Sequence, residues 1–307
     1  MLIAISWRSI GDLVWGTDLL VRIQEVFSPS WYWLFELFSY LGDTQGVLLL
    51  TALAFWISGR RLAYSLVGIV VFSMTIDLVI GTLIGLPRPE DPRIIVWKDE
   101  FTSSFPSGHT ALATSMWGML AALNWMPKLI SAIAVAGVGL ARLYFGVHYL
   151  GDIIGGVLIG TVLIVAYLRI LPALDQFFKR RSFKFWQFWG GLIFAGVLVA
   201  IPFAGDSARV WHVMGTVAGF IVGGLVEYRY ICYRPTPVSK TKQLIKLLIG
   251  LGILIPLLLI PLVLDDEQLV LEALVFFAAA LWTLLFAPIV FALMHFSDHA
   301  LTKKHLP

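Results

Sequence analysis

Charged residues are scarce in this chain of 307 residues. They account for 13% of the sequence, whereas hydrophobic residues account for 59%. A soluble globular domain carries about 25% charged residues, so this chain lacks the polar surface that would cover a body exposed to water. With a mean hydropathy of +0.87, the composition excludes a soluble enzyme, a disordered chain and a secreted disulfide scaffold. It predicts a polytopic membrane protein.

Cysteine and asparagine each occur once, as Cys232 and Asn124. A single cysteine cannot form a disulfide within the chain. The asparagine is not part of an Asn-x-Ser/Thr sequence, so the chain shows no acceptor site for lumenal glycosylation. Residues 1–28 carry too many charges for a cleavable signal peptide. We therefore expect an integral protein of a bacterial inner membrane.

Long apolar segments fill most of the chain. A membrane-spanning helix needs about 20 mostly apolar residues, and nine segments are candidates: residues 44–58, 62–85, 109–124, 129–143, 148–170, 186–204, 210–231, 244–264 and 269–296. Before them, residues 8–27 are amphipathic and predict an interfacial helix. Residues 31–41 predict either a re-entrant piece or the first part of one helix with 44–58. The expected fold is an all-α transmembrane bundle of about nine spans.

Basic residues gather on one side when the loops between spans are assigned to alternate sides. One side holds Arg60, Arg61, Lys128, Arg169, Lys179, Arg180, Arg181, Lys184, Arg229, Arg234, Lys240, Lys242, Lys246, Lys303 and Lys304. The other side holds Arg88, Arg93, Lys98, Arg142 and Arg209. Short loops rich in lysine and arginine face the cytoplasm, so the second side is predicted to face the periplasm or the exterior.

A basic loop at residues 172–185 divides the chain. We expect three parts from this division. Residues 1–43 form an interfacial or re-entrant N-terminal segment, residues 44–171 form a catalytic core, and residues 186–307 form a C-terminal bundle of four spans.

Three polar clusters lie at predicted span ends on the non-cytoplasmic side. They are Arg88-Pro89, then Pro106-Ser107-Gly108-His109, then Arg142 with His148 and Asp152. Each cluster alone is also explained by a helix boundary, a turn with an N-cap, or a structural His–Asp pair. Ionisable groups at a membrane boundary are costly, however, so their joint occurrence on one side indicates a functional site.

The binding groups in these clusters suit a phosphate ion. Arg88 and Arg142 each present a planar guanidinium, which binds phosphate oxygens through two parallel hydrogen bonds and stays charged. Ser107 and Gly108 lie where a helix begins, and the free N–H groups of a helix start attract anions. Glycine also lets an anion approach the backbone closely.

The remaining groups suit catalysis by histidine. His148 and Asp152 are four residues apart, so on a helix they share one face. The carboxylate can then hold one imidazole nitrogen while the other nitrogen acts as a nucleophile. His109 is a second imidazole, which suits protonation of a leaving oxygen near neutral pH.

These residues resemble the signature of the type 2 phosphatidic acid phosphatase (PAP2) superfamily. The motifs of that family are Lys-x6-Arg-Pro, Pro-Ser-Gly-His and Ser-Arg-x5-His-x3-Asp, and they are matched here within residues 88–152. Two positions differ: Gly81 stands at the lysine of the first motif and Ala141 at the serine of the third. The layout of nine spans with an outward site and a four-span tail is similar to that of glucose-6-phosphatase, a member of the same superfamily.

The resemblance implies a metal-independent phosphatase, without a cofactor, that forms a phosphohistidine at the non-cytoplasmic face. It implies His148 as the nucleophile, Asp152 as its orienting carboxylate and His109 as the general acid. It implies phosphoryl binding by Arg88, Ser107, Gly108 and Arg142. Arg93 or Lys98 could replace the charge of the missing lysine. Asp77, one turn before Gly81, is expected to be a buried polar group with no part in catalysis.

The aromatic residues Trp97, Phe101 and Phe105 precede the second motif. Aromatic side chains anchor at the level of lipid headgroups, which favours a lipid phosphate or diphosphate of the phosphatidate or polyprenyl type, although the three could also anchor only the loop. A sugar phosphate substrate, phosphate transfer to another lipid, and a non-catalytic phosphate-binding transporter stay open. The expected partners are the substrate and the bilayer, with no nucleic acid, and the oligomeric state is left open.

Overall fold

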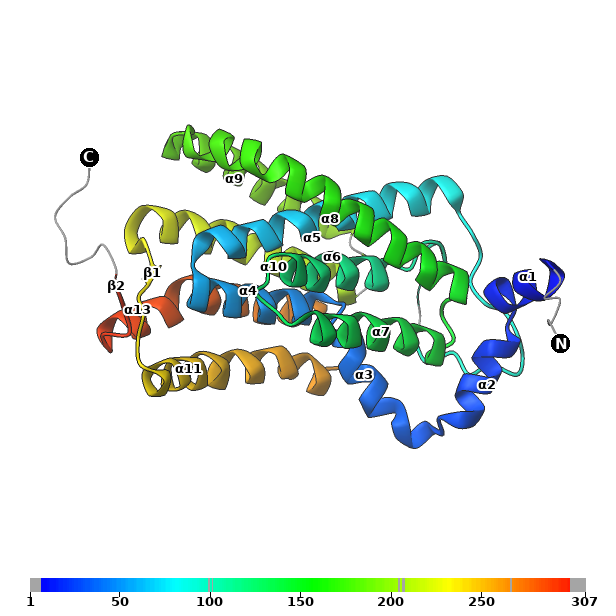
Figure 1. The fold of residues 1–307 in the computed structure, drawn as a ribbon. Helices are drawn as coiled ribbons and strands as arrows, with labels where there is room; N and C mark the ends of the chain where they lie inside the picture. The colour runs from blue at the N-terminus through cyan, green and yellow to red at the C-terminus, as the bar shows by residue number, and fades with distance from the viewer. Residues whose placement is uncertain are drawn as a thin grey trace. The chain divides into compact units, whose positions relative to one another are not determined.

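The computed structural model describes residues 7–98, 100, 102–203, 205, 208–265 and 267–298. Phe101, Lys303 and Lys304 lie outside the described residues. The fold is helical (Figure 1). It forms two compact units: unit 1 holds the described parts of Met1–Val47 and Leu66–Pro172, and unit 2 those of Leu48–Ser65 and Ala173–Pro307.

Unit 1 contains the first helices and all the predicted site residues. Its elements are α1 (Trp7–Trp15), α2 (Asp18–Val26), the short 3-10 helix η1 (Pro29–Trp31), α3 (Tyr32–Tyr40), the start of α4 (Thr44–Ser58), most of α5 (Arg60–Ile84), α6 (Gly108–Ala122), α7 (Lys128–Tyr144) and most of α8 (Leu150–Lys179). Helix α7 packs against both α6 and α3.

Small residues bring α8 close to α6. A methyl group at Gly160 would lie 2.6 Å from Cβ of Thr114 and 2.9 Å from the carbonyl oxygen of Ala111. Such close approach of helix backbones is typical of membrane helices, where packing replaces the hydrophobic effect as the driving force. The contact fixes the start of α8, which carries Asp152, beside the start of α6, which carries His109.

The segment between α5 and α6 is held by the N-terminal helices. The Gln24 side chain of α2 donates to the carbonyl oxygens of Ile95 at 2.8 Å and Tyr144 at 2.7 Å, and it accepts from the backbone N–H of Ile95 at 2.9 Å. The Thr17 hydroxyl donates to Asp91 at 2.6 Å. These bonds fix the segment that carries Arg88 against α2 and the end of α7.

Unit 2 contains the C-terminal helices. Its elements are the rest of α4, the start of α5, the end of α8, α9 (Phe183–Ala200), η2 (Ile201–Phe203), α10 (Ala208–Val226), the π-helical turn η3 (Glu227–Ile231), β1 (Arg234–Pro235), α11 (Lys240–Leu259), η4 (Ile260–Val263), α12 (Leu269–Leu281), the π-helical turn η5 (Trp282–Phe286), α13 (Ala287–Leu293) and β2 (Ser297–Asp298). Strands β1 and β2 pair antiparallel. Glycines of α10 let it pack closely on α12, since a methyl at Gly219 would lie 2.7 Å from the carbonyl oxygen of Phe277.

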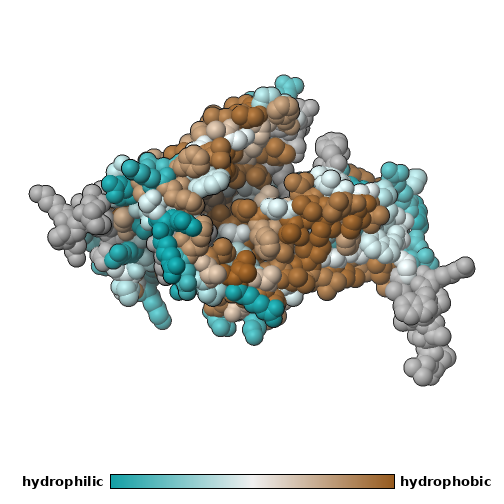
Figure 2. Space-filling view, turned by 90° about the horizontal axis from the view of Figure 1, so that it is seen from above, coloured by the Kyte–Doolittle hydropathy of each residue, from teal (hydrophilic) through white to brown (hydrophobic). Residues whose placement is uncertain are grey.

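The described residues of all nine segments predicted as spans are mainly helical, but nine full spans are not confirmed. Among the described residues, six helices are long and apolar enough to cross a membrane, and α3 with α4 adds a seventh if this pair, bent by 52°, is one broken span. Helices α6 and α7 have only 15 and 17 residues. Apolar residues cover much of the face seen in Figure 2, and large side chains such as Leu158 and Val162 are exposed. The protein is an integral membrane protein.

Candidate active site

Five of the seven predicted site residues have side chains that lie in one network in unit 1, namely Arg88, His109, Arg142, His148 and Asp152. Arg88 Nη1 lies 3.4 Å from Nε2 of His148. Arg142 Nη1 lies 3.5 Å from both ring nitrogens of His109. Glu100, a residue that the motifs do not include, joins the two arginines. The fold therefore brings together side chains from four separate segments of the chain that the sequence motifs had singled out.

His148 and Asp152 form a pair at the start of α8. The Nδ1 atom of His148 lies 3.3 Å from Oδ2 of Asp152, and the side chains are 1% and 0% exposed. The same carboxylate oxygen accepts hydrogen bonds from the backbone N–H of Tyr149 at 2.8 Å and from the hydroxyl of Ser104. Asp152 is therefore fixed, and it holds Nδ1 of the imidazole while Nε2 faces Arg88.

Burial lowers the pKa of His148 below its ordinary value of 6.5. The hydrogen bond with Asp152 raises the pKa and so opposes this shift, whereas the positive charge of Arg88 lowers the pKa further. The neutral imidazole is favoured as a result, and the neutral ring is the form that can act as a nucleophile.

The two arginines are held by different parts of the protein. Arg88 donates through Nε to the carbonyl oxygen of Thr102 at 3.0 Å and through Nη1 to that of Val147 at 2.8 Å. Arg142, in the last turn of α7, is 1% exposed and donates through Nη2 to the hydroxyl of Ser39 at 2.5 Å. Both guanidinium groups are thus oriented by neutral acceptors, and each also faces Glu100.

The Glu100 carboxylate lies between the groups that were predicted to bind the phosphoryl oxygens. Its Oε2 is 3.4 Å from Nη2 of Arg88, its Oε1 is 3.2 Å from Nη1 of Arg142, and Oε1 is also 3.9 Å from Nδ1 of His109. The side chain is 15% exposed. An anionic group thus occupies the centre of the arginine pair.

The start of α6 differs in detail from the expectation. The Ser107 hydroxyl bonds to Oγ1 of Thr110 at 3.0 Å and makes no cap hydrogen bond. A methyl at Gly108 would lie 2.5 Å from Oδ2 of Asp77, so the close neighbour that requires glycine here is a carboxylate of α5. Phosphate binding by Ser107 and Gly108 stays a prediction.

Two further polar residues come from the junction of α3 and α4. Ser39 contacts Arg142, as described above, and Oδ2 of Asp43 lies 3.5 Å from Nε2 of His109. Sequence analysis missed both, because they precede Arg88 by more than forty residues and no local spacing connects them to it. The only local signal was the Gly42-Asp43 break after an aromatic segment.

A small cleft of about 150 Å³ opens beside the network and is lined by Arg88, Pro89, Val96, Lys98, Glu100, Gly146 and Val147. Of the two cations considered as substitutes for the missing lysine, Lys98 reaches this cleft. Its Nζ pairs with Glu36 at 2.9 Å. Burial acts to lower the pKa of Lys98, but the Glu36 carboxylate outweighs it and the pKa is raised. Arg93 pairs instead with Asp18 and Asp91.

The described aromatic residues of the loop, Trp97 and Phe105, are half-buried and pack against other aromatic rings. Trp97 stacks on Tyr144 with ring centroids 6.1 Å apart, and Phe105 lies 6.1 Å from Trp15. Both rings therefore contact other parts of unit 1, and an anchor in the headgroup layer stays a prediction.

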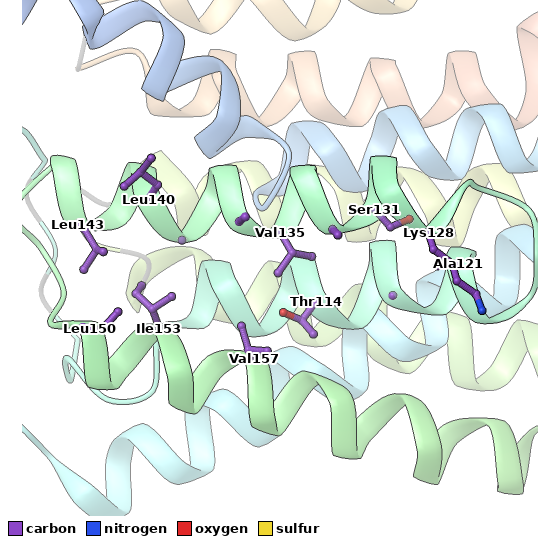
Figure 3. Close-up of a pocket in the computed structure, with 14 residues that line it drawn as sticks. Thr114, Ala121, Lys128, Ser131, Val135, Leu140, Leu143, Leu150, Ile153 and Val157 are labelled. Carbon is purple, nitrogen blue, oxygen red and sulfur yellow. The ribbon is translucent and has the colours of Figure 1, made fainter. Parts of the chain in front are cut away.

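A larger apolar groove of about 570 Å³ lies between α6, α7 and α8 (Figure 3). Figure 3 shows Leu143, Leu150 and Ile153 at one end and Lys128 at the other. Each of these three apolar residues is one or two positions from Arg142, His148 or Asp152 in the sequence. Among the described residues, no group of three or more His, Cys, Asp or Glu side chains could hold a metal ion.

Two family profiles match the sequence. Residues 62–176 match the PAP2 superfamily, and residues 211–299 match the transmembrane extension of PAP2 superfamily phosphatases. The first match contains all seven predicted site residues, whereas Ser39 and Asp43 precede it.

Similar proteins include lipid phosphate phosphatase delta of Arabidopsis thaliana, which is 27% identical over 62% of this chain and 50% of its own length. Human sphingosine-1-phosphate phosphatase 2 is 31% identical over 48% of this chain and 40% of its own length. The chain therefore matches about half or less of these relatives. The crystal structure of a PAP2 type phosphatidylglycerolphosphate phosphatase from Bacillus subtilis aligns with a TM-score of 0.45 and 19% identity, over 58% of this chain and 92% of that one.

Proposed function

Because this chain belongs to the PAP2 superfamily, we propose that it is a membrane phosphatase that hydrolyses a lipid phosphate or diphosphate through a phosphohistidine. The observation that carries the proposal is the arrangement around Glu100: two arginines hold a carboxylate, and one of them also contacts Nε2 of His148. A site that only binds phosphate has no need for a buried imidazole held by a carboxylate beside the anion position.

In the proposed reaction, Nε2 of His148 attacks phosphorus and the bond from phosphorus to the leaving oxygen breaks. His109 donates a proton to that oxygen. Water then attacks phosphorus while His109 takes up its proton, the bond from phosphorus to Nε2 of His148 breaks, and inorganic phosphate leaves. Asp152 keeps a proton on Nδ1 of His148, while Arg88 and Arg142 stabilise the charge on the phosphoryl oxygens.

A lipid substrate is supported by two observations. The relatives are named for lipid phosphates and for sphingosine 1-phosphate, and an apolar groove starts beside the proposed site at Leu143 and Leu150. A sugar phosphate stays the second candidate, because the predicted layout is similar to that of glucose-6-phosphatase.

The membrane and the sidedness of the site are part of the proposal. The distribution of basic residues supports a site on the non-cytoplasmic face. We keep the bacterial inner membrane as a prediction, although the matched relatives named above are from a plant and from human. The division into residues 1–43, 44–171 and 186–307 likewise stays a prediction.

The test is phosphate release by the purified protein in lipid vesicles. The panel contains phosphatidate, phosphatidylglycerol phosphate, undecaprenyl diphosphate, sphingosine 1-phosphate and glucose 6-phosphate, and rapid quenching with labelled substrate detects an acid-labile phosphoenzyme. His148→Ala should abolish both phosphate release and the phosphoenzyme, while the thermal unfolding midpoint stays close to wild type. Turnover retained in His148→Ala would exclude the phosphohistidine, and activity on glucose 6-phosphate alone would exclude the lipid substrate.

A further inference from the structure

Asp43 connects the bend between α3 and α4 to the proposed general acid. One carboxylate oxygen, Oδ1, accepts from the backbone N–H of Thr44 at 2.7 Å and lies 3.3 Å from the Thr44 hydroxyl, at the start of α4. The other oxygen, Oδ2, lies 3.5 Å from Nε2 of His109. The two side chains are 19% and 5% exposed. The carboxylate is therefore held at the helix start while it faces the imidazole.

The charges around His109 oppose one another. Arg142 Nη1 is 3.5 Å from each ring nitrogen, so the guanidinium disfavours a second positive charge on the ring. The positive end of the α6 dipole acts in the same direction, because His109 is in the first turn of that helix. Three carboxylates act in the other direction: Asp43 at Nε2, Glu100 at Nδ1, and Asp77 against the neighbouring Gly108.

Substrate binding is expected to displace Glu100 and to leave Asp43 in place. Glu100 lies between the two arginines, where the phosphoryl group is proposed to bind, so it has to move when substrate enters. Asp43 approaches from the opposite ring nitrogen and is fixed by its bonds to Thr44. Asp43 is thus the carboxylate that still faces the ring in the substrate complex.

We propose that Asp43 is a positioning residue that holds a proton on Nε2 of His109, so that Nδ1 faces the leaving oxygen. The inference rests on the proposed phosphatase function. In the first step, Nδ1–H passes its proton to the leaving oxygen as the bond to phosphorus breaks. The ring becomes neutral and keeps its Nε2–H toward Asp43. In the second step, Nδ1 takes the proton of the attacking water, which restores the imidazolium, and Asp43 stays ionised throughout.

The variant Asp43→Asn distinguishes the positioning of His109 by Asp43 from a contribution of Asp43 to the stability of the fold. Asparagine is as good an N-cap as aspartate, so the start of α4 and the thermal unfolding midpoint should be kept while the charge is lost. The test uses two substrates that carry the same long chain, an alkyl phosphate and a nitroaryl phosphate. The alkyl phosphate requires a general acid to protonate its leaving oxygen, whereas a nitrophenolate leaves without a proton. Asp12→Asn, which removes an exposed carboxylate of α1, is the matched control.

We expect Asp43→Asn to lower kcat/KM for the alkyl phosphate by about tenfold or more, as part of the 10²- to 10⁴-fold contribution of a general acid. For the nitroaryl phosphate kcat/KM, which reports only the steps up to formation of the phosphohistidine, should change little, and the alkaline limb of the kcat/KM profile for the alkyl phosphate should move to lower pH. His109→Ala should show the same dependence on the leaving group, and the double variant should be no slower than His109→Ala. Asp12→Asn should behave as wild type.

An equal loss of kcat/KM on both substrates, or no loss on either, would overturn the role of Asp43 while the proposed function stands, provided that wild type is active and His148→Ala is not. If wild-type protein releases phosphate from neither substrate, the proposed function is wrong and the role of Asp43 is lost with it.

Discussion

Because Glu100 pairs with both Arg88 and Arg142, we expect its carboxylate to compete with the phosphoryl group that these arginines are proposed to bind, so its removal should tighten anion binding. Glu100→Gln keeps the size of the side chain and removes its charge. The contacts that an entering phosphate has to break measure 3.4 Å to Arg88 and 3.2 Å to Arg142. Two unit charges about 4 Å apart near a protein surface attract each other by about 4 kcal/mol before desolvation is counted.

Desolvation reduces this figure, because Arg142 is only 2% exposed and Glu100 is 15% exposed. A net gain of about 1.4 to 2.8 kcal/mol in anion affinity is therefore a reasonable expectation, which corresponds to a ten- to hundredfold lower inhibition constant. The assay is inhibition of phosphate release by orthovanadate and by inorganic phosphate. Glu90→Gln removes the same charge from an exposed position in the same loop and should leave both inhibition constants unchanged.

The opposite result would be equally clear. If Glu100→Gln binds vanadate no better than wild type, or less well, the carboxylate does not compete for the anion position, and its contacts serve to orient the arginines. The same conclusion follows if Glu90→Gln tightens binding as much as Glu100→Gln, because the effect would then come from the overall charge of the loop.

Four further predictions test other parts of the site. Gly81→Lys should raise activity on lipid phosphates, because the change restores the missing cation. A Cβ at Gly81 would make only ordinary contacts of 3.6 and 3.9 Å. A fall in kcat/KM would mean that the space beside Gly81 is needed for activity. Ala136→Phe, which narrows the apolar groove, should lower kcat/KM for long-chain phosphates and not for short ones, and Ile133→Phe on the outer face of the same helix should do neither. The acid limb of kcat/KM should lie below pH 6.5, because the lowered pKa of His148 keeps the ring neutral as the pH falls. Asp152→Asn removes a group that raises this pKa, so the limb should move to still lower pH while kcat falls, which a pH–rate profile will check.

Local spacing was sufficient for part of the site. His148 and Asp152 were expected to meet because they are four residues apart at a helix start, and their atoms lie 3.3 Å apart. The helical segments followed from hydropathy, since a membrane span needs a long apolar run that is visible in one dimension. Such features depend only on neighbours along the chain.

Contacts between distant segments could not be obtained in the same way. Glu100 was one of several acidic residues in a loop, and its position between two arginines depends on how that loop folds. Ser39 and Asp43 reach the site because α3 packs against α7, and one sequence carries no sign of that packing. Hydropathy also failed to give a firm number of spans, because α6 and α7 are short and α3 bends into α4.

The amide of Gln24 couples the position of α2 to the geometry of the proposed site. One side chain ties α2 both to the loop that carries Arg88 and to the carbonyl of Tyr144, two residues after Arg142. We expect the amphipathic N-terminal helices to lie in the membrane interface, at a depth that bilayer thickness and headgroup packing determine. We expect a lipid mixture that lifts or tilts α2 to change the distance between the two guanidinium groups, and the proposed turnover would then depend on lipid composition as well as on the protein.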